Sequence, residues 1–249
     1  MRGIGKFFLM QFKLYLREPV AFFFSLAYPV LLLLLFGFIY GNQPAPEFWG
    51  RNFGTVDASV PAYAAIIVGT VALMGIPIDT ATNRETGVLR RYRATPLHPV
   101  AYLIASLAVY LVIALFGMVL LVLTGKLVFG LRMEGSWLSI LVAFVLSAFS
   151  FFSVGYLIAS VVPTSRIAQA VGMVIFFPMM FLSGAGLPLQ ILPEGLQKVS
   201  DFLPMSYVVR LIQGLWFGDT WADLWMPVLV LAGMLVVGTS LSSRLFRWE

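Results

Sequence analysis

The chain alternates between long apolar stretches and short polar segments. Six stretches of about 20 residues contain no Asp, Glu, Lys, Arg or His. A helix rises ~1.5 Å per residue and the hydrocarbon layer is about 30 Å thick, so each stretch can cross a membrane. Runs such as PVLLLLLFGFIY do not alternate in polarity as barrel strands do. The pattern predicts an all-α integral membrane protein with six transmembrane helices, at 19–40, 60–78, 99–124, 137–162, 167–187 and 224–243.

Composition supports a lipid environment. Of 249 residues, 60% are apolar and 11% are charged, and the mean hydropathy is +0.95, outside the balance of soluble domains. The first span is too long for a signal-peptide core and no A-x-A site follows it, so we expect it to stay attached. The net charge of +5 does not indicate nucleic-acid binding, because cytoplasmic loops of membrane proteins carry an excess of Lys and Arg.

Basic residues are divided unequally between the two sides of the predicted bundle. Of the 16 Lys and Arg, the side with both termini holds eleven and the other side five. By the positive-inside rule, both termini are expected in the cytoplasm. The five on the other side are Arg51, Lys126, Arg132, Lys198 and Arg210.

The segment 1–18 predicts an amphipathic interfacial helix. Four of its basic residues follow one another at intervals of 4, 7 and 4, which gathers them within roughly 60° of a helix circumference. Such a helix lies in the membrane interface, either as a simple anchor or also as a docking site for a partner. The basic residues are Arg2, Lys6, Lys13 and Arg17.

The densest cluster of charges follows the second span, in DTATNRETGVLRRYRATPLHP. Thr82 or Asn83 can cap a short helix over 82–95, with Glu85 near its positive end. Three arginines lie near its negative end, and prolines stop it. The helix is suited to a partner's groove, or it is only a basic loop that sets topology. The arginines are Arg90, Arg91 and Arg93.

Before the last span, the segment 188–222 is too apolar for a solvated loop and is interrupted by Pro and Gly. Helical spacing of its leucines predicts short helices that dip into the outer leaflet or lie on it. Three tryptophans are predicted interface anchors. They are Trp216, Trp221 and Trp225.

Several kinds of chemistry are missing from the sequence. No G-x-x-x-x-G-K-[ST] loop is present, so any ATP must be hydrolysed by another chain. Spans without ionisable residues argue against proton-coupled carriers and voltage sensors. There is no cysteine, and the single histidine, His98, has no acid or nucleophile beside it. We therefore expect no catalytic residue, no metal site and no cofactor in this chain.

The fifth span contains a candidate hinge and substrate surface. Pro178 is predicted to bend this span. Aromatic and Met side chains around it form an adaptable apolar surface that could receive a hydrophobic substrate, or they pack against neighbouring helices or lipid. The candidate path residues are Met74, Phe176, Phe177, Pro178, Met179, Met180 and Phe181.

Three segments together carry a family resemblance. They are LYLREP before the first span, NRETGVLRRYRATPL after the second, and FFPMMFLSGAGLPLQILPEGLQKVSDFLPMSYVVRLIQGLWFG from the fifth span onward. In this order they resemble the type-2 permeases of ABC transporters over nearly the whole chain, as a single domain 1–249. The short loops on the outer side are most similar to those of bacterial drug-resistance permeases of the daunorubicin type.

The resemblance implies a function and an assembly. It implies an ATP-driven exporter in a bacterial or archaeal cell membrane, with two permeases, identical or related, and two ATPase subunits that bind ATP and Mg²⁺. The loop after the second span would be the coupling helix, which places Glu85, Arg90, Arg91 and Arg93 near the ATPase, and the interfacial helix would be the second contact. Spans two and five would border the path. The alternatives are export of a lipid-linked glycan or lipid, a non-transporting assembly subunit similar to those of cytochrome maturation, and last an ion channel.

Overall fold

The structure, a computed structural model, describes residues 12–13, 22–46, 52–88 and 99–245, without the side chains of 99–102. The described residues form helices joined by turns and loops, and no strand. Six helices are long and apolar enough to cross a membrane, which confirms the all-α, six-span prediction. These are Phe23–Tyr40, Thr55–Glu85, Leu103–Phe129, Trp137–Val161, Ser165–Leu182 and Trp225–Leu245.

The first two spans are built from more than one helical element, and short helices precede the last span. The elements are η1 (Phe23–Ala27), α3 (Tyr28–Tyr40), α5 (Thr55–Thr70), η2 (Val71–Gly75), α6 (Ile76–Glu85), α8 (Pro99–Phe129), α9 (Trp137–Val161), α10 (Ser165–Leu182), η3 (Leu189–Ile191), α11 (Glu194–Ser200), α12 (Pro204–Trp216) and α13 (Trp225–Leu245).

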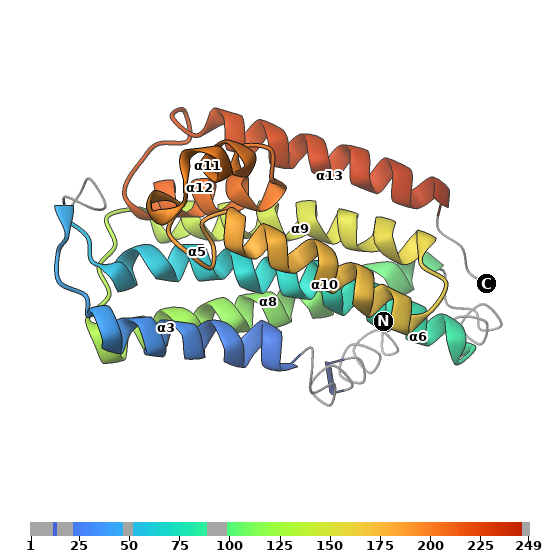
Figure 1. The fold of residues 1–249 in the computed structure, drawn as a ribbon. Helices are drawn as coiled ribbons and strands as arrows, with labels where there is room; N and C mark the ends of the chain where they lie inside the picture. Colours follow the sequence, from blue (N-terminus) through green and yellow to red (C-terminus); the bar gives the residue numbers. More distant parts are fainter. Residues whose placement is uncertain (1–11, 14–21, 47–51, 89–98, 246–249) are drawn as a thin grey trace.

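The long helices run side by side between two ends of the molecule (Figure 1). α3 runs from near the middle of the bundle toward one end, and α13 ends at the other end, where α6 and the turn between α9 and α10 also lie. We call this the Glu85 end, after the last residue of α6. The opposite end carries α11 and α12, and we call it the Asp57 end, after the acid in the first turn of α5.

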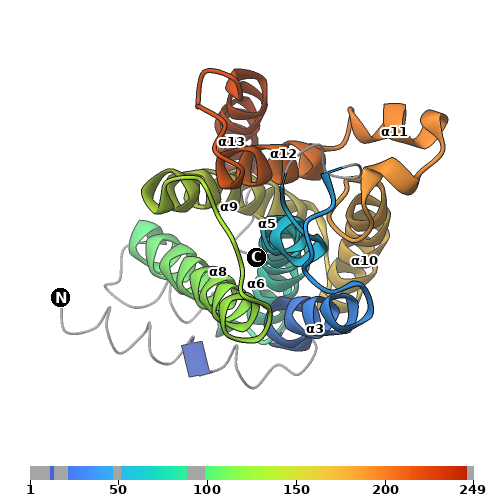
Figure 2. The same cartoon turned by 90° about the vertical axis from the view of Figure 1, so that its left-hand side faces the viewer.

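The second span is the axis of the bundle. α5 is surrounded by α3, α8, α9, α10 and α12 (Figure 2). In the most apolar stretch of the second span 94% of the residues are buried within the chain, against 28% in the first span and 22% in the last. α5 is rich in Ala and Gly, and small residues let helix backbones approach closely where lipid supplies no hydrophobic drive for association.

Glycines on the surrounding helices make this approach possible. A Cβ added at Gly155 of α9 would overlap the carbonyl O of Ala72, and one added at Gly172 of α10 would lie 2.5 Å from the carbonyl O of Leu73. Both carbonyls belong to η2. Two different helices therefore press their backbones against the same turn of the enclosed helix.

Both π-helical turns lie just before a proline. η1 ends two residues before Pro29, and η2 ends two residues before Pro77. Proline lacks an N–H, and its ring clashes with the carbonyl four residues earlier. A wider turn gives that carbonyl room, so the spans continue through their prolines. α10 likewise continues through Pro178 and ends at Leu182.

The second span extends beyond its predicted ends and includes three acids, Asp57, Asp79 and Glu85. Asp57 and Asp79 are 22 residues apart (79 − 57), which is about 33 Å of helix rise and close to the hydrocarbon thickness. At the far end the helix continues through Thr82, whose Oγ1 donates to the carbonyl of Ile78 at 2.8 Å. The prediction that Thr82 or Asn83 caps a new helix is therefore wrong. The break comes at Gly87, whose φ of 70° is the left-handed conformation that ends many helices.

The segment 188–222 folds into η3, α11 and α12 and lies at the Asp57 end. α12 is inserted into the bundle, and its Met205 side chain lies where a side chain at Gly69 of α5 would have to be. Trp216, at the end of α12, is fully buried. Its prediction as an interface anchor is wrong, because its indole N–H donates to the carbonyl O of Arg132 at 3.0 Å inside the protein. Trp225, by contrast, is 63% exposed.

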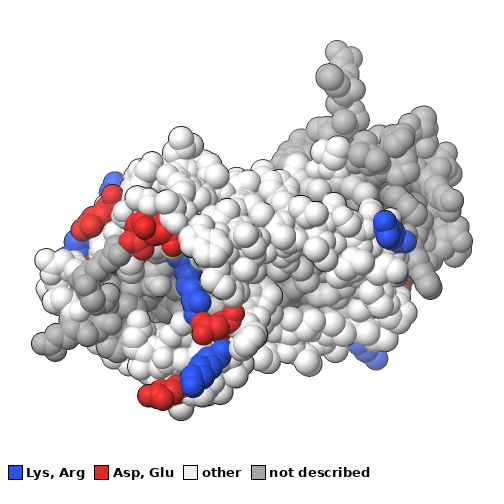
Figure 3. All heavy atoms as spheres, turned by 90° about the horizontal axis from the view of Figure 1, so that it is seen from above, with Lys and Arg blue, Asp and Glu red and all other residues white. Residues whose placement is uncertain are grey.

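Charged side chains are confined to the two ends of the visible surface. Viewed from the side of α12 and α13, they gather at the Asp57 end and at the opposite end, with a broad uncharged band between them (Figure 3). An uncharged band is what a hydrocarbon layer requires, because unpaired charges are costly there.

A substitution at Gly155 tests the close contact around η2. The variant Gly155→Ala forces α9 away from the carbonyl of Ala72, and we expect a loss of about 1–3 kcal/mol in stability, as for other overpacked cores. The measurement is thermal unfolding of the purified protein in mild detergent. Gly233→Ala on α13 is the matched control, because nothing lies within 4 Å of its added Cβ. Equal melting of the two variants would contradict the packing argument.

Candidate functional site

Two adjacent residues at the end of α6 hold the turn between α9 and α10. Arg84 donates from Nη1 to the carbonyl O of Val162 at 3.1 Å and from Nη2 to that of Ala159 at 2.5 Å. Glu85 accepts from the backbone N of Ser165 at 3.2 Å and from its Oγ at 2.8 Å. One helix end is therefore bonded to the end of α9 and to the start of α10.

The charges match the helix ends that they contact. The last carbonyls of a helix carry partial negative charge and its first N–H groups partial positive charge. The Arg84 guanidinium lies at the carboxyl end of α9, and the Glu85 carboxylate lies at the amino end of α10. A displacement of the end of α6 must therefore move the α9–α10 turn with it or break these bonds.

Only part of the predicted coupling and interfacial sets falls in the described residues. Glu85 is exposed and bonded to Ser165, and Lys13 is exposed. Outside the described residues lie Arg2, Lys6, Arg17, Arg90, Arg91, Arg93 and His98.

The candidate path residues divide into a core group and a surface group. The buried ones are Met74, Phe176, Met179 and Met180; Phe177 is half-buried, and Pro178 and Phe181 are exposed. The expectation that the second span borders a path is not met in this structure, because helices of the same chain enclose it. The exposed positions are on α10 alone.

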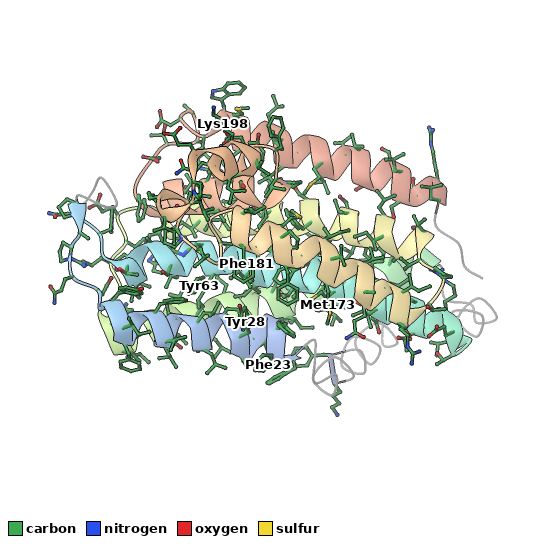
Figure 4. The ribbon with its side chains drawn as sticks, in the orientation of Figure 1. Phe23, Tyr28, Tyr63, Met173, Phe181 and Lys198 are labelled. Atoms are coloured by element: carbon green, nitrogen blue, oxygen red, sulfur yellow. The ribbon has the colours of Figure 1, made fainter. Side chains whose placement is uncertain are left out.

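Aromatic side chains fill the face between α3 and α10. The rings of Phe24 and Phe177 meet edge to face with centroids 6.0 Å apart, and the Tyr28 hydroxyl donates to the Met180 sulfur at 3.8 Å. Figure 4 shows Tyr28 on α3 opposite Met173 and Phe181 on α10. This face is an apolar, polarizable surface of the kind that accommodates varied hydrophobic molecules.

A buried ionic cluster closes the Asp57 end. Asp57 is fully buried, and its carboxylate accepts four hydrogen bonds: from Asn42 Nδ2 at 2.8 Å, Gly54 N at 2.9 Å, Arg132 N at 2.8 Å and Arg132 Nε at 3.0 Å. Four is about the full acceptor capacity of a carboxylate. Arg132 also donates from Nη2 to the carbonyl of Asn42 at 2.5 Å.

The Asp57 cluster joins four separate parts of the chain. Asn42 follows α3, Asp57 begins α5, Arg132 lies between α8 and α9, and Trp216 ends α12 and binds the carbonyl of Arg132. The sequence did not reveal this cluster. The only signal was the presence of one acid and one arginine in the polar segments on the same side, without any indication of their pairing.

A small cavity of ≈ 70 Å³ lies beside α12 at this end. It is lined by α5, the 184–190 loop and α12, and Gln213 closes one side by donating to the carbonyl O of Ala58 at 3.1 Å. Beyond α12, Thr220 donates its backbone N–H and hydroxyl to Asp223, which lowers the pKa of that carboxyl. Its charge is thus retained in the turn before α13.

The six-span helical bundle, with its uncharged belt and polar ends, defines a multi-pass membrane protein. The profile of the ABC-2 type transporter family matches residues 7–217, so the chain belongs to that family and is a membrane-spanning component of an ABC transporter. Membership implies partnership with a separate ABC ATPase subunit.

Individual relatives agree with this assignment. The chain is 26% identical over 250 residues to the daunorubicin resistance ABC transporter permease protein DrrB1 of Streptomyces coeruleorubidus, covering 96% of this chain and 83% of that protein. It is 26% identical over 228 residues to the putative transport permease ycf38 of Cyanophora paradoxa, and the match covers 88% of this chain and 76% of that protein. A shorter match, 31% identical over 114 residues, is to nodulation protein J of Rhizobium leguminosarum bv. trifolii, and it covers 45% of this chain and 44% of that protein.

Breaking the Asp57 cluster should weaken the fold more than breaking a surface ion pair. We expect Asp57→Ala to cost about 3 kcal/mol, because it leaves a partly buried guanidinium and several donors without their acceptor. Asp201→Ala removes the exposed partner of Arg210 and should cost less than about 1 kcal/mol. Denaturant titration of both variants in detergent measures the difference, and similar costs would refute a structural role for the buried cluster.

Proposed function

We propose that this chain forms the translocation path of an ATP-driven exporter for a hydrophobic or amphiphilic compound, such as a drug, an antibiotic or a lipid-like molecule. Two ATPase subunits, which bind the ATP and Mg²⁺, dock at the Glu85 end. A second permease, identical or related, completes the path. The excess of Lys and Arg supports a cytoplasmic position for this end and for both termini, and the proposed location is a bacterial or archaeal cell membrane.

The observation that carries the proposal is the double contact of Arg84 and Glu85 with the α9–α10 turn. Only three residues separate Glu85 from the arginine-rich segment 89–98 in the chain. A force that an ATPase applies to that segment therefore passes first to the end of α6 and then, through the hydrogen bonds of Glu85 to Ser165, to the start of α10. α10 in turn packs along α6 and η2, so its tilt is coupled to the axis of the bundle.

The aromatic and Met-rich face between α3 and α10 supports a hydrophobic or amphiphilic substrate. Phe177 and Phe181 leave part of their surface open there, and a hydrophobic compound needs such a surface rather than charged ligating groups. The name of the Streptomyces relative, a daunorubicin resistance permease, agrees with this class. A lipid-linked glycan is the second candidate substrate, because its lipid part also needs an apolar surface.

Docking of the ATPase is tested by a pull-down of the tagged chain from mild detergent. Wild type should retain an ATP-binding-cassette subunit, and the variant Arg90→Ala, Arg91→Ala, Arg93→Ala should lose most of it, since three cations leave the segment at once. The control variant Lys126→Ala, Lys198→Ala removes cations on the opposite side and should retain the subunit. If folded wild type retains no ATPase, the exporter loses its energy source and a membrane scaffold takes its place.

Glu85 tests transmission separately from docking. Glu85→Ala removes the carboxylate that caps α10, which costs about 1 kcal/mol of local stability and frees the α9–α10 turn. We expect the reconstituted complex to keep its ATPase subunit but to lose most substrate stimulation of ATP hydrolysis. Glu194→Ala, an acid in the first turn of α11, is the matched control. Full stimulation in the Glu85 variant would exclude this route of coupling.

A further inference from the structure

A crevice opens on the side of the bundle away from the aromatic face. Its volume is ≈ 310 Å³, and it lies where α8, α9 and α13 meet. The lining comes from all three helices and includes five hydroxyl side chains. The lining residues are Leu103, Leu107, Phe149, Ser153, Tyr156, Leu235, Thr239, Ser242 and Ser243.

Tight packing of α13 on α9 fixes one wall of the crevice. Ser150 Oγ donates to the carbonyl O of Leu231 at 2.8 Å, and Ser153 Oγ approaches that of Met234 at 3.3 Å. Gly238 of α13 faces Ser153 so closely that an added Cβ would overlap its hydroxyl. α8 packs mainly against α5 and α3 and only lightly against α9, so α9 forms the floor of the crevice between α8 and α13.

The polarity of the crevice changes along its length. Phe149 and Leu235 lie in the middle of their helices, whereas Thr239 and Ser242 lie toward the Glu85 end. Leu235 and Ser242 are seven residues apart (242 − 235), which is about 10 Å of rise along α13. Tyr156 and Ser243 likewise lie toward the Glu85 end, whereas the α8 wall is apolar there, with Leu103 and Leu107. The crevice therefore offers a lipid molecule one apolar wall and, on α9 and α13, hydroxyls that become more numerous toward the Glu85 end.

A cation follows the last lining residue in the sequence of α13. Arg244 is in the last turn of α13, next to Ser243 of the lining, and its side chain is exposed. Basic residues beside grooves between membrane helices bind anionic lipid head groups. The hydroxyls of Thr239 and Ser242 can add hydrogen bonds to the glycerol and ester oxygens below such a head group.

We propose that this crevice binds one acyl chain of an anionic phospholipid from the leaflet at the Glu85 end, with the phosphate at Arg244. A soluble ligand does not reach a groove that faces the hydrocarbon layer. The site is separate from the face between α3 and α10, and it does not depend on the proposed exporter function.

The test uses purified wild-type protein in vesicles of phosphatidylcholine that contain a small fraction of phosphatidylglycerol with a photoreactive diazirine in its acyl chain. After illumination, labelled peptides are mapped. We expect labelling concentrated at Phe149 and Leu235. Thr239→Trp fills the crevice and should reduce this labelling about fivefold or more, whereas Leu241→Trp, on an exposed position of α13 outside the lining, should not.

The head-group contact is tested with the same photoreactive chain on phosphatidylcholine. Wild type should label about fivefold more with the anionic probe, the preference expected from one cation at the membrane surface, and Arg244→Gln should abolish that preference. Equal labelling around all lipid-facing helices, or no effect of Thr239→Trp, overturns the proposal. So does a disulfide between two copies of the Thr239→Cys variant, which would show that a second copy covers the crevice; the chain has no native cysteine to confuse this result.

Discussion

Close backbone contact around the enclosed second span is the constraint on which the rest of the structure depends. Within lipid, burying apolar surface gives little drive for helix association, so helices must come close enough for packing and hydrogen bonds to hold them. Gly155 and Gly172 bring α9 and α10 against the η2 carbonyls, and Gly69 receives Met205 of α12. The enclosed helix thereby fixes the positions of its neighbours, and it leaves α3, α10 and α13 as the helices with large lipid- or partner-facing surfaces.

The two ends of this axis are fastened in different ways. At one end the buried Asp57 carboxylate accepts its full number of hydrogen bonds, including those from Arg132 and Asn42. This end of the bundle is therefore held rigidly. At the other end Arg84 and Glu85 contact the α9–α10 turn from a partly exposed position. Exposed hydrogen bonds open more easily than buried ones. A movement that begins at the Glu85 end can therefore pass into the bundle while the Asp57 end stays intact.

Much of the membrane architecture was predictable, because length and hydropathy report directly on the crossing of a bilayer. The six spans were predicted in this way, whereas the family was predicted from the resemblance of three sequence segments. The capping of a new helix at Thr82 was predicted wrongly, since Thr is compatible with a helix interior when its hydroxyl bonds to the carbonyl four residues earlier. Trp216 was misassigned because the sequence does not show the hydrogen-bond partner of a tryptophan. An indole N–H that donates to a lipid head group and one that donates to the Arg132 carbonyl look the same in the sequence.

The sequence by itself therefore determined that the chain is a helical membrane protein with six crossings and charged segments beyond them. Only the tertiary structure decided which apolar residues are inside, since hydropathy cannot separate a side chain that faces lipid from one that faces another helix. Met74 is buried, whereas Phe181 on α10 is exposed, although both belong to apolar spans. The pairing of Asp57 with Arg132 across 75 residues also depended on the fold, because a bond between distant polar segments exists only after the helices between them have packed.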